Sequence, residues 1–189
     1  YDLVPEPAVV DAVRSMAGRM SIVSAERIRD ELDKLVRCPA PAAGLRFVLD
    51  TGLAGEVLPE LTGRAIEVVA AIEVSRRAAR WAALFDAVEA TAARARMRAL
   101  RASTADVDDV DRLVAGRSAG GAGDWPDADL RRLVRDAGRA LDDLLALVDA
   151  RAATDPADPA IRVGVRSARE RMARWSTTGE LASLEPELD

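Results

Sequence analysis

The amino-acid sequence predicts an all-α fold, built as an irregular array of helices, and three observations support this. Ala, Leu and Val supply most of the 49% hydrophobic content, whereas aromatic residues make up only 3%, and Ala and Leu favour helices. Apolar residues recur every three or four positions, and no segment shows the strict alternation of a half-buried strand. No longer period recurs, which argues against a regular solenoid.

The first part of the chain reads as a series of short helices. Apolar residues spaced three or four apart predict a helix from about Ala8, and Ser24 is placed to cap a second helix. A third helix should end at Thr51–Gly52, because glycine adopts the left-handed conformation that closes helices. Leu53–Leu61 follows as a last short turn. These elements form a predicted first domain, residues 1–62.

The middle of the chain is rich in arginine. Residues 63–101 contain almost no helix breaker and hold eight arginines against four acidic residues, a local charge of 8 − 4 = +4, so we expect a helical segment without an obvious break. Ser103 or Thr104 should cap a further helix that ends at Gly116. Together these residues form the predicted second domain, residues 63–116.

A cluster of carboxylates lies on this last helix. Asp106, Asp108, Asp109 and Asp111 surround valines that should face inward, and no ligand-rich loop accompanies them. A solvated helix face is therefore a better interpretation than a metal site.

The remaining sequence predicts a flexible linker at 117–123, rich in glycine, and a helical tail at 124–189. One apolar stripe runs from Leu130 to Val148 and predicts an amphipathic helix. After a break that contains two prolines, Ile161–Trp175 predicts a second, basic helix with five arginines and one glutamate.

The overall composition limits the possible functions. A net charge of −5 argues against general polyanion binding, although the cations are almost all arginine. Arginine suits phosphate recognition, but a GC-rich genome produces the same bias. Cys38 is the only cysteine, which indicates a half-buried structural thiol in a reducing compartment. No apolar run is long enough to span a membrane, so we expect a cytoplasmic protein.

A specific motif lies in the first domain. Met20–Leu35 contains Ser-Ala-Glu-Arg-Ile followed by Glu-Leu, and Gly44-Leu45, Thr51-Gly52-Leu53 and Val57–Leu61 come after it. This order and spacing resemble the neck and body of bacterial class II tRNA nucleotidyltransferases, the family of CCA-adding enzymes and poly(A) polymerases. The family-motif residues are Ser24, Glu26, Arg27 and Glu31. Arg27 and Glu31 are also spaced to form an ordinary solvated i,i+4 pair.

A second resemblance covers Asp124–Gly138, which is similar to the segment after the HD domain in actinobacterial members of that family. Those relatives hold a divalent metal with histidines and aspartates, whereas this sequence contains no histidine. Arg80–Phe85 and Ala95–Arg101 resemble the helices on either side of the missing ligands. The resemblance therefore implies a degenerate HD region without a metal, and Asp86 is expected to be a solvated carboxylate.

The resemblance implies that the chain is the part of a tRNA nucleotidyltransferase that binds tRNA or another RNA 3′ end. The catalytic head is absent, because paired aspartates beside a Gly-rich strand are missing. Catalytic residues and cofactors are therefore expected only in an upstream head of the same polypeptide, with Mg and ATP or CTP. The chain alone should be inactive. The candidate phosphate contacts are Arg76, Arg77, Arg80, Arg94, Arg96, Arg98 and Arg101.

A non-enzymatic helical scaffold of the same descent is the alternative interpretation. Exposed Trp125 or Trp175 would suit protein–protein contacts, and so would the acidic net charge. The start of the sequence without Met indicates a piece of a longer protein. A gene that continues upstream into a nucleotidyltransferase head would favour the enzyme, and a start codon just before Tyr1 would favour the scaffold.

Overall fold

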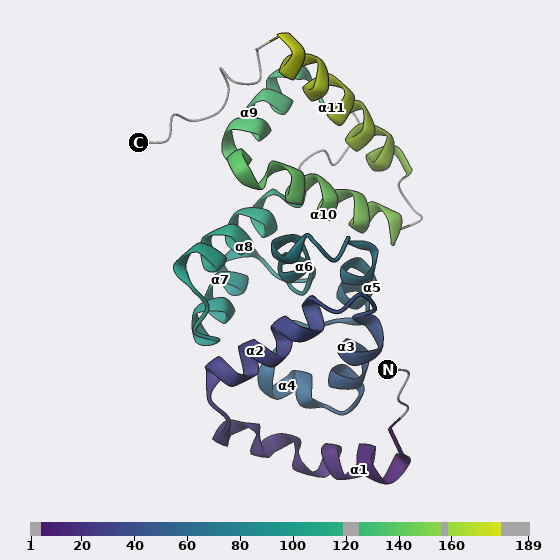
Figure 1. Ribbon diagram of the computed structural model, residues 1–189, viewed down its shortest axis with the longest axis vertical. Helices are drawn as coiled ribbons and strands as arrows, with labels where there is room; N and C mark the ends of the chain where they lie inside the picture. Colours follow the sequence, from purple (N-terminus) through teal and green to yellow (C-terminus); the bar gives the residue numbers. More distant parts are fainter. Residues whose placement is uncertain (1–4, 119–124, 156–158, 179–189) are drawn as a thin grey trace.

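The computed structural model describes residues 5–118, 125–155 and 159–178, which form helices and turns with no strand among them, so the all-α prediction is confirmed. The helices are stacked along one long axis (Figure 1). Helix α1 (Pro7–Met16) lies at one end of this axis, and α11 (Pro159–Thr178) lies toward the other. No described helix is both long enough and apolar enough to cross a membrane.

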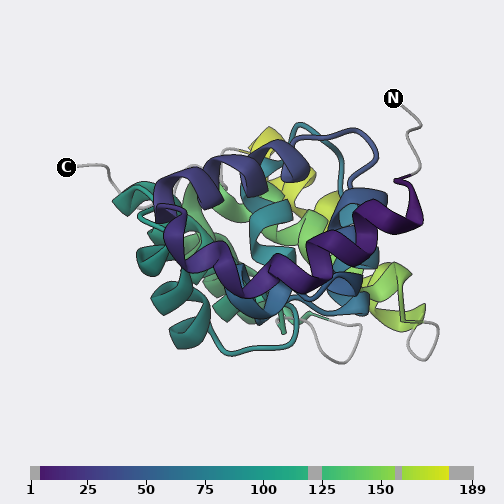
Figure 2. The same ribbon diagram turned by 90° about the horizontal axis from the view of Figure 1, so that it is seen from below.

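The N-terminal part begins with a helix that packs poorly and continues with three that pack well. Helix α1 has no buried residue and passes at Met16 into the 3-10 helix η1 (Ala17–Ile22), where the sequence pattern predicted one continuous helix. Figure 2, which views the molecule from this end, shows the pair crossing in front of the other helices. The next helices are α2 (Ala25–Val36), α3 (Ala42–Asp50) and α4 (Leu53–Val57). Gly52 has the expected left-handed backbone, with φ of 80°.

The segment 63–101 is helical as expected, but it is divided into three helices. The structure has α5 (Gly63–Ala71), α6 (Arg77–Ala83) and α7 (Ala90–Ala99), and turns separate them. These turns bury Ile72, Leu84 and Phe85 completely or nearly so. Burial of large apolar side chains outweighs the weak local preference for helix, so the chain turns without a glycine or proline. Helix α8 (Thr104–Gly116) has the predicted bounds and Ser103 as its cap.

The apolar stripe from Leu130 to Val148 is also divided. It forms α9 (Asp127–Ala137), the 3-10 turn η2 (Gly138–Ala140) and α10 (Leu141–Ala153). The break lies at Gly138, whose φ of 49° and ψ of −128° are accessible to glycine but not to other residues at ordinary cost. The two helices can therefore pack on different neighbours.

One hydrophobic core runs through the predicted domains, from Leu32 in α2 to Trp175 in α11. Helix α10 joins its two ends, because it packs on α5, α6 and α8 on one side and on α11 on the other. Gly116 allows the close approach of α8, since a Cβ there would lie 3.0 Å from the Leu144 methyl groups. Of the predicted linker 117–123, only Arg117 and Ser118 lie within the described residues.

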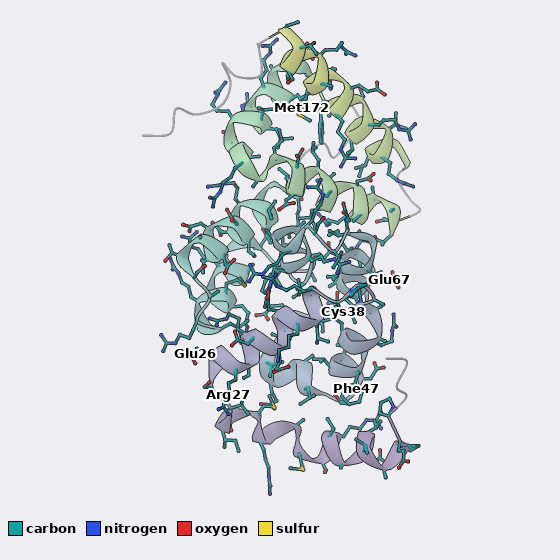
Figure 3. All side chains as sticks on the ribbon, viewed as in Figure 1. Glu26, Arg27, Cys38, Phe47, Glu67 and Met172 are labelled. Atoms are coloured by element: carbon teal, nitrogen blue, oxygen red, sulfur yellow. The ribbon has the colours of Figure 1, made fainter. Side chains whose placement is uncertain are left out.

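Both tryptophans of the tail are buried, so the expectation that one of them is exposed is wrong. Trp125 is 5% exposed and Trp175 is 8% exposed. The guanidinium of Arg131 lies 4.8 Å from the centre of the Trp175 ring, at cation–π distance. Figure 3 labels Met172 on the same helix, on the side that faces α9. These side chains attach α11 to the rest of the protein and leave its opposite face free.

Candidate nucleic-acid interface

The first two candidate arginines are held by carboxylates from distant helices. Arg76 donates to Asp143 of α10 at 3.0 Å. Arg77 donates to Asp33 of α2 and to Asp106 of α8, each at 2.5 Å. Burial would lower the pKa of Arg77, but these two carboxylates outweigh it and raise that pKa. Both arginines therefore connect helices and are not free to receive a phosphate.

Arg80 lies inside the protein and cannot face RNA in this structure. The residue is only 2% exposed. It donates to the carbonyl of Ile72 through Nε and Nη2, and through Nη1 to the carbonyls of Val36 and Cys38, at 2.7–2.9 Å. Burial lowers the pKa of this guanidinium. These hydrogen bonds hold the turn after α5 and the end of α2 against α6. Arg80 is therefore not the surface cation that the sequence predicted.

Arg94 and Arg96 are also paired within the molecule. Arg94 spans Asp108 and Asp111 of α8 at 2.8 and 2.7 Å, and Arg96 donates to both oxygens of Glu60 at 3.0 Å. The acidic face of α8 is therefore not simply solvated, as the sequence indicated, because arginines neutralise it. Its valines do face inward as expected. Most of the +4 charge of residues 63–101 is thus compensated by carboxylates elsewhere in the fold.

Arg98 and Arg101 remain available. Both are exposed, and neither side chain has a hydrogen-bond or ion-pair partner among the described residues. Arg101 follows the C-cap of α7 with a φ of 56°, a left-handed conformation that costs a non-glycine residue about 1–2 kcal/mol. Its carbonyl accepts a 2.5 Å hydrogen bond from Arg29 of α2. The residue just after the C-cap of α7 therefore adjoins α2.

The four family-motif residues lie in these first turns of α2. Ser24 accepts from the backbone N–H of Arg27 at 3.4 Å and caps the helix as predicted. Figure 3 labels Glu26 and Arg27 at this end of α2. Glu31 bonds to Lys34 at 2.7 Å, so the i,i+4 pair with Arg27 considered from the sequence is not formed. The side chain of Arg27 is exposed and has no partner in the described chain.

We call Arg27, Arg29, Arg98 and Arg101 the α2–α7 edge. Three of these arginines have unpaired, exposed guanidinium groups, and the fourth ties the two helices together while also pairing with Asp30 at 2.7 Å. The sequence analysis named Arg98 and Arg101 as candidates for their charge and Arg27 for its motif. It missed Arg29, and it missed Asp33, because pairing across helices leaves no local signal in the sequence.

An apolar pocket of about 600 Å³ adjoins this edge. Met20 and Val23 of the preceding segment, Ile28 and Leu35 of α2, and residues of α3 and α4 line it, while Arg27 and Glu31 stand among its polar lining residues. It contains no aromatic side chain, so it offers no platform on which a base could stack. Its chemistry suits aliphatic side chains.

Asp86, in the region that resembles a degenerate HD domain, is not the solvated carboxylate that we expected. Asp86 is 7% exposed rather than solvated. Arg64 bonds to its Oδ2 at 3.0 Å, and the Nε of Arg151 lies 2.6 Å from Oδ1 as an ion pair without hydrogen-bond alignment. Guanidinium groups thus surround this carboxylate. Among the described residues no group of three His, Cys, Asp or Glu could hold a metal ion.

Comparison with known proteins gives one finding. Residues 2–63, about a third of the chain, match the family model described as the probable RNA and SrmB-binding site of polymerase A. No curated protein and no solved structure matches the sequence. The matched residues include the α2 motif with Arg27, and also Arg29. They include every residue that lines the apolar pocket. The N-terminal third of this chain is therefore similar to the RNA-binding region of polymerase A proteins.

Proposed function

We propose that the chain is the RNA-binding portion of a tRNA nucleotidyltransferase and holds the acceptor end of tRNA at the α2–α7 edge. The observation that carries this proposal is the coincidence of two features. The matched RNA-binding region contains Arg27, whose side chain has no partner among the described residues. Of the seven candidates, only Arg98 and Arg101 likewise have side chains without a described partner, and they lie in the last turn of α7 and just after it, where the chain adjoins α2.

The chemistry of the edge supports a phosphate backbone as the ligand. A guanidinium offers several N–H donors and keeps its charge, so it binds phosphate oxygens well. The neighbouring arginines are already neutralised by Asp33, Asp106 and Asp143, so they would add little attraction. Contacts of this kind position RNA without reading its sequence.

A nucleotidyltransferase also needs a catalytic head, and this proposal assigns the head to another part of the natural polypeptide. Mg and ATP or CTP would bind there. The chain alone should not add nucleotides to tRNA, nor hydrolyse phosphomonoesters with added Mg, Mn or Ni. Turnover that survives repurification would contradict this assignment.

Fluorescence anisotropy with a labelled acceptor-stem hairpin tests the RNA site. The variant R27Q/R98Q/R101Q should flatten the slope of log K against log salt by about two units, since each lost phosphate contact removes about 0.7–0.9. The control R112Q/R132Q/R139Q changes the net charge equally but removes arginines that are near carboxylates, so its slope should stay close to the wild-type value. Equal slopes for wild type and the edge variant would refute the proposal.

A second candidate function, a protein-binding scaffold, is favoured by the apolar pocket beside α2. Its aliphatic lining would accept the side chains of a partner helix. Under this interpretation the wild-type protein would show no saturable binding to the hairpin at low salt. The titration above therefore decides between the two candidates.

A further inference from the structure

A second group of unpaired cations lies on α11. Arg166, Arg169 and Arg174 are exposed, and none of their side chains has a hydrogen-bond or ion-pair partner among the described residues. The other arginines of this helix behave differently, because Arg162 lies 3.5 Å from Asp149 and Arg171 lies 2.8 Å from Asp127. We call Arg166, Arg169 and Arg174 the α11 surface.

The α11 surface is presented by a helix whose other face is fixed. Val165, Ala168, Met172 and Trp175 are buried against the core, so the orientation of the helix is determined by packing. At a rise of about 1.5 Å per residue, the three arginines are spread over about 12 Å along the helix axis. They are spread around the exposed side of the helix, with the exposed Glu170 one turn from both Arg166 and Arg174, and they do not form a pocket for one small anion.

A nucleic-acid backbone fits the α11 surface better than a lipid surface does. A helix that binds membranes as an amphipath inserts an apolar face, but the apolar face of α11 is occupied by the core. Val163 is the one large exposed apolar side chain of the described helix. Binding of a phosphate backbone requires accessible cations and no apolar face, and a local group of cations can supply this even on a protein with a net charge of −5.

The two basic surfaces are far from each other in the stack of helices. Figure 1 shows α8 and α10 between α7 and α11, and the contacts of α10 with α8 on one side and α11 on the other agree with this. A short RNA held at the α2–α7 edge would therefore not reach α11. An extended or folded RNA that continues past α8 and α10 could contact both surfaces.

We infer that the α11 surface is a second contact for the RNA backbone, which makes the protein selective for RNAs long enough to reach from the α2–α7 edge to α11. This inference rests on the proposed function, because it assumes RNA at the first surface. It adds a preference for RNA size to a site that by itself reads only phosphate.

The test compares two probes, the short acceptor-stem hairpin and a complete tRNA, across a series of salt concentrations. For the variant R166Q/R169Q/R174Q we expect hairpin binding equal to wild type, and a tRNA slope about two units smaller, with at least several-fold weaker binding at low salt. The edge variant R27Q/R98Q/R101Q should weaken both probes. The charge-matched control R112Q/R132Q/R139Q should weaken neither. Helical circular dichroism and the melting temperature confirm that each variant is folded.

The outcomes separate the two proposals. If wild type binds tRNA and the α11 variant binds it with the same slope, the inference is wrong while the proposed function stands. If the α11 variant weakens the hairpin as much as tRNA, the two surfaces are not separate and the inference is again wrong. If wild type binds neither probe, the proposed function fails and this inference fails with it. Binding to anionic phosphatidylserine vesicles that requires the α11 arginines would overturn the assignment to RNA.

Discussion

Helices α6 and α11 both carry arginines in an alanine-rich sequence, yet their arginines have opposite environments. The arginines of α6 and its start donate hydrogen bonds within the protein, to carboxylates and carbonyls of four other segments. They are Arg76, Arg77 and Arg80. On α11, the side chains of Arg166, Arg169 and Arg174 have no partner in the described chain. Local charge in the sequence therefore does not reveal which cations a ligand can reach.

The difference follows from the position of each helix in the stack. Helix α6 packs against α2, α5, α8 and α10, so acidic side chains approach it from several directions. Helix α11 packs mainly on α10 and has one side open. The arginines of α6 that several helices surround stabilise the fold, whereas Arg166, Arg169 and Arg174 on the open side of α11 remain available for binding. The following predictions test this distinction, from the largest expected effect to the smallest.

Replacement of Arg80 should have the largest effect. The variant R80M keeps much of the side-chain volume but leaves the carbonyls of Ile72, Val36 and Cys38 without their donor. We expect a loss of about 3–5 kcal/mol in the free energy of unfolding, because several buried acceptors lose a charged partner together. Urea denaturation followed by circular dichroism measures this loss. A loss below about 1 kcal/mol would break the distinction between the two helices.

Asp33 should have the next largest effect. Its carboxylate accepts from Arg37, Arg77 and the indole of Trp81 at 2.5–2.8 Å, so D33N should cost about 2–3 kcal/mol at neutral pH. Its control is D30N, since Asp30 is 60% exposed and a surface pair contributes about 0–1 kcal/mol.

The stability due to Asp33 should also depend on pH. Burial would raise the pKa of Asp33, but the hydrogen bonds from Trp81, Arg37 and Arg77 outweigh it and lower that pKa. The stabilisation is therefore complete above the pKa of an unfolded aspartate, about 3.9, and is lost as the pH falls through the lower folded value. The difference in stability between wild type and D33N should shrink only below about pH 4. A difference that shrinks already near pH 6 would show that another group controls it.

Arg101 offers a smaller test in the opposite direction. Its φ of 56° suits glycine, so R101G should increase the free energy of unfolding by about 1 kcal/mol. The same variant should weaken binding to the acceptor-stem hairpin, because it removes one cation of the α2–α7 edge. Greater stability with unchanged RNA affinity would show that this arginine has no binding role.

The α11 surface should show the smallest effect on folding. The variant R166Q/R169Q/R174Q removes side chains without partners, so its free energy of unfolding should change by no more than about 0.5 kcal/mol. Thermal denaturation at low and moderate salt measures this. A loss comparable to that of D33N would reveal contacts of these arginines that matter for folding.

Much of the helical content could be predicted from the sequence, because it depends on local signals. Ser24 and Ser103 cap their helices as expected, and Gly52 closes α3. The breaks inside residues 63–101 and at Gly138 were missed, since the first depends on the burial of Ile72 and Phe85 and the second on one backbone conformation. Neither leaves a periodic signal.

The candidate site was predictable only in part. The motif around Arg27 lies in the region that matches the RNA-binding family model. The availability of each arginine was not predictable, because the partners of Arg77 are 44 and 29 residues away in the sequence. The expected solvation of Asp86 failed for the same reason, since Arg64 and Arg151 approach it from α5 and α10. Whether the available arginines bind RNA stays a prediction.

Cys38 gives the protein a built-in reporter of local opening. It is the only cysteine, its side chain is partly buried, and its carbonyl accepts a bond from Arg80 at 2.7 Å. A thiol-reactive reagent can therefore modify one site only, and loss of the Arg80 contact should raise its rate above that of the partly accessible wild-type thiol. Comparison of the labelling rates of wild type and R80M would report on this contact without denaturant and without an added probe.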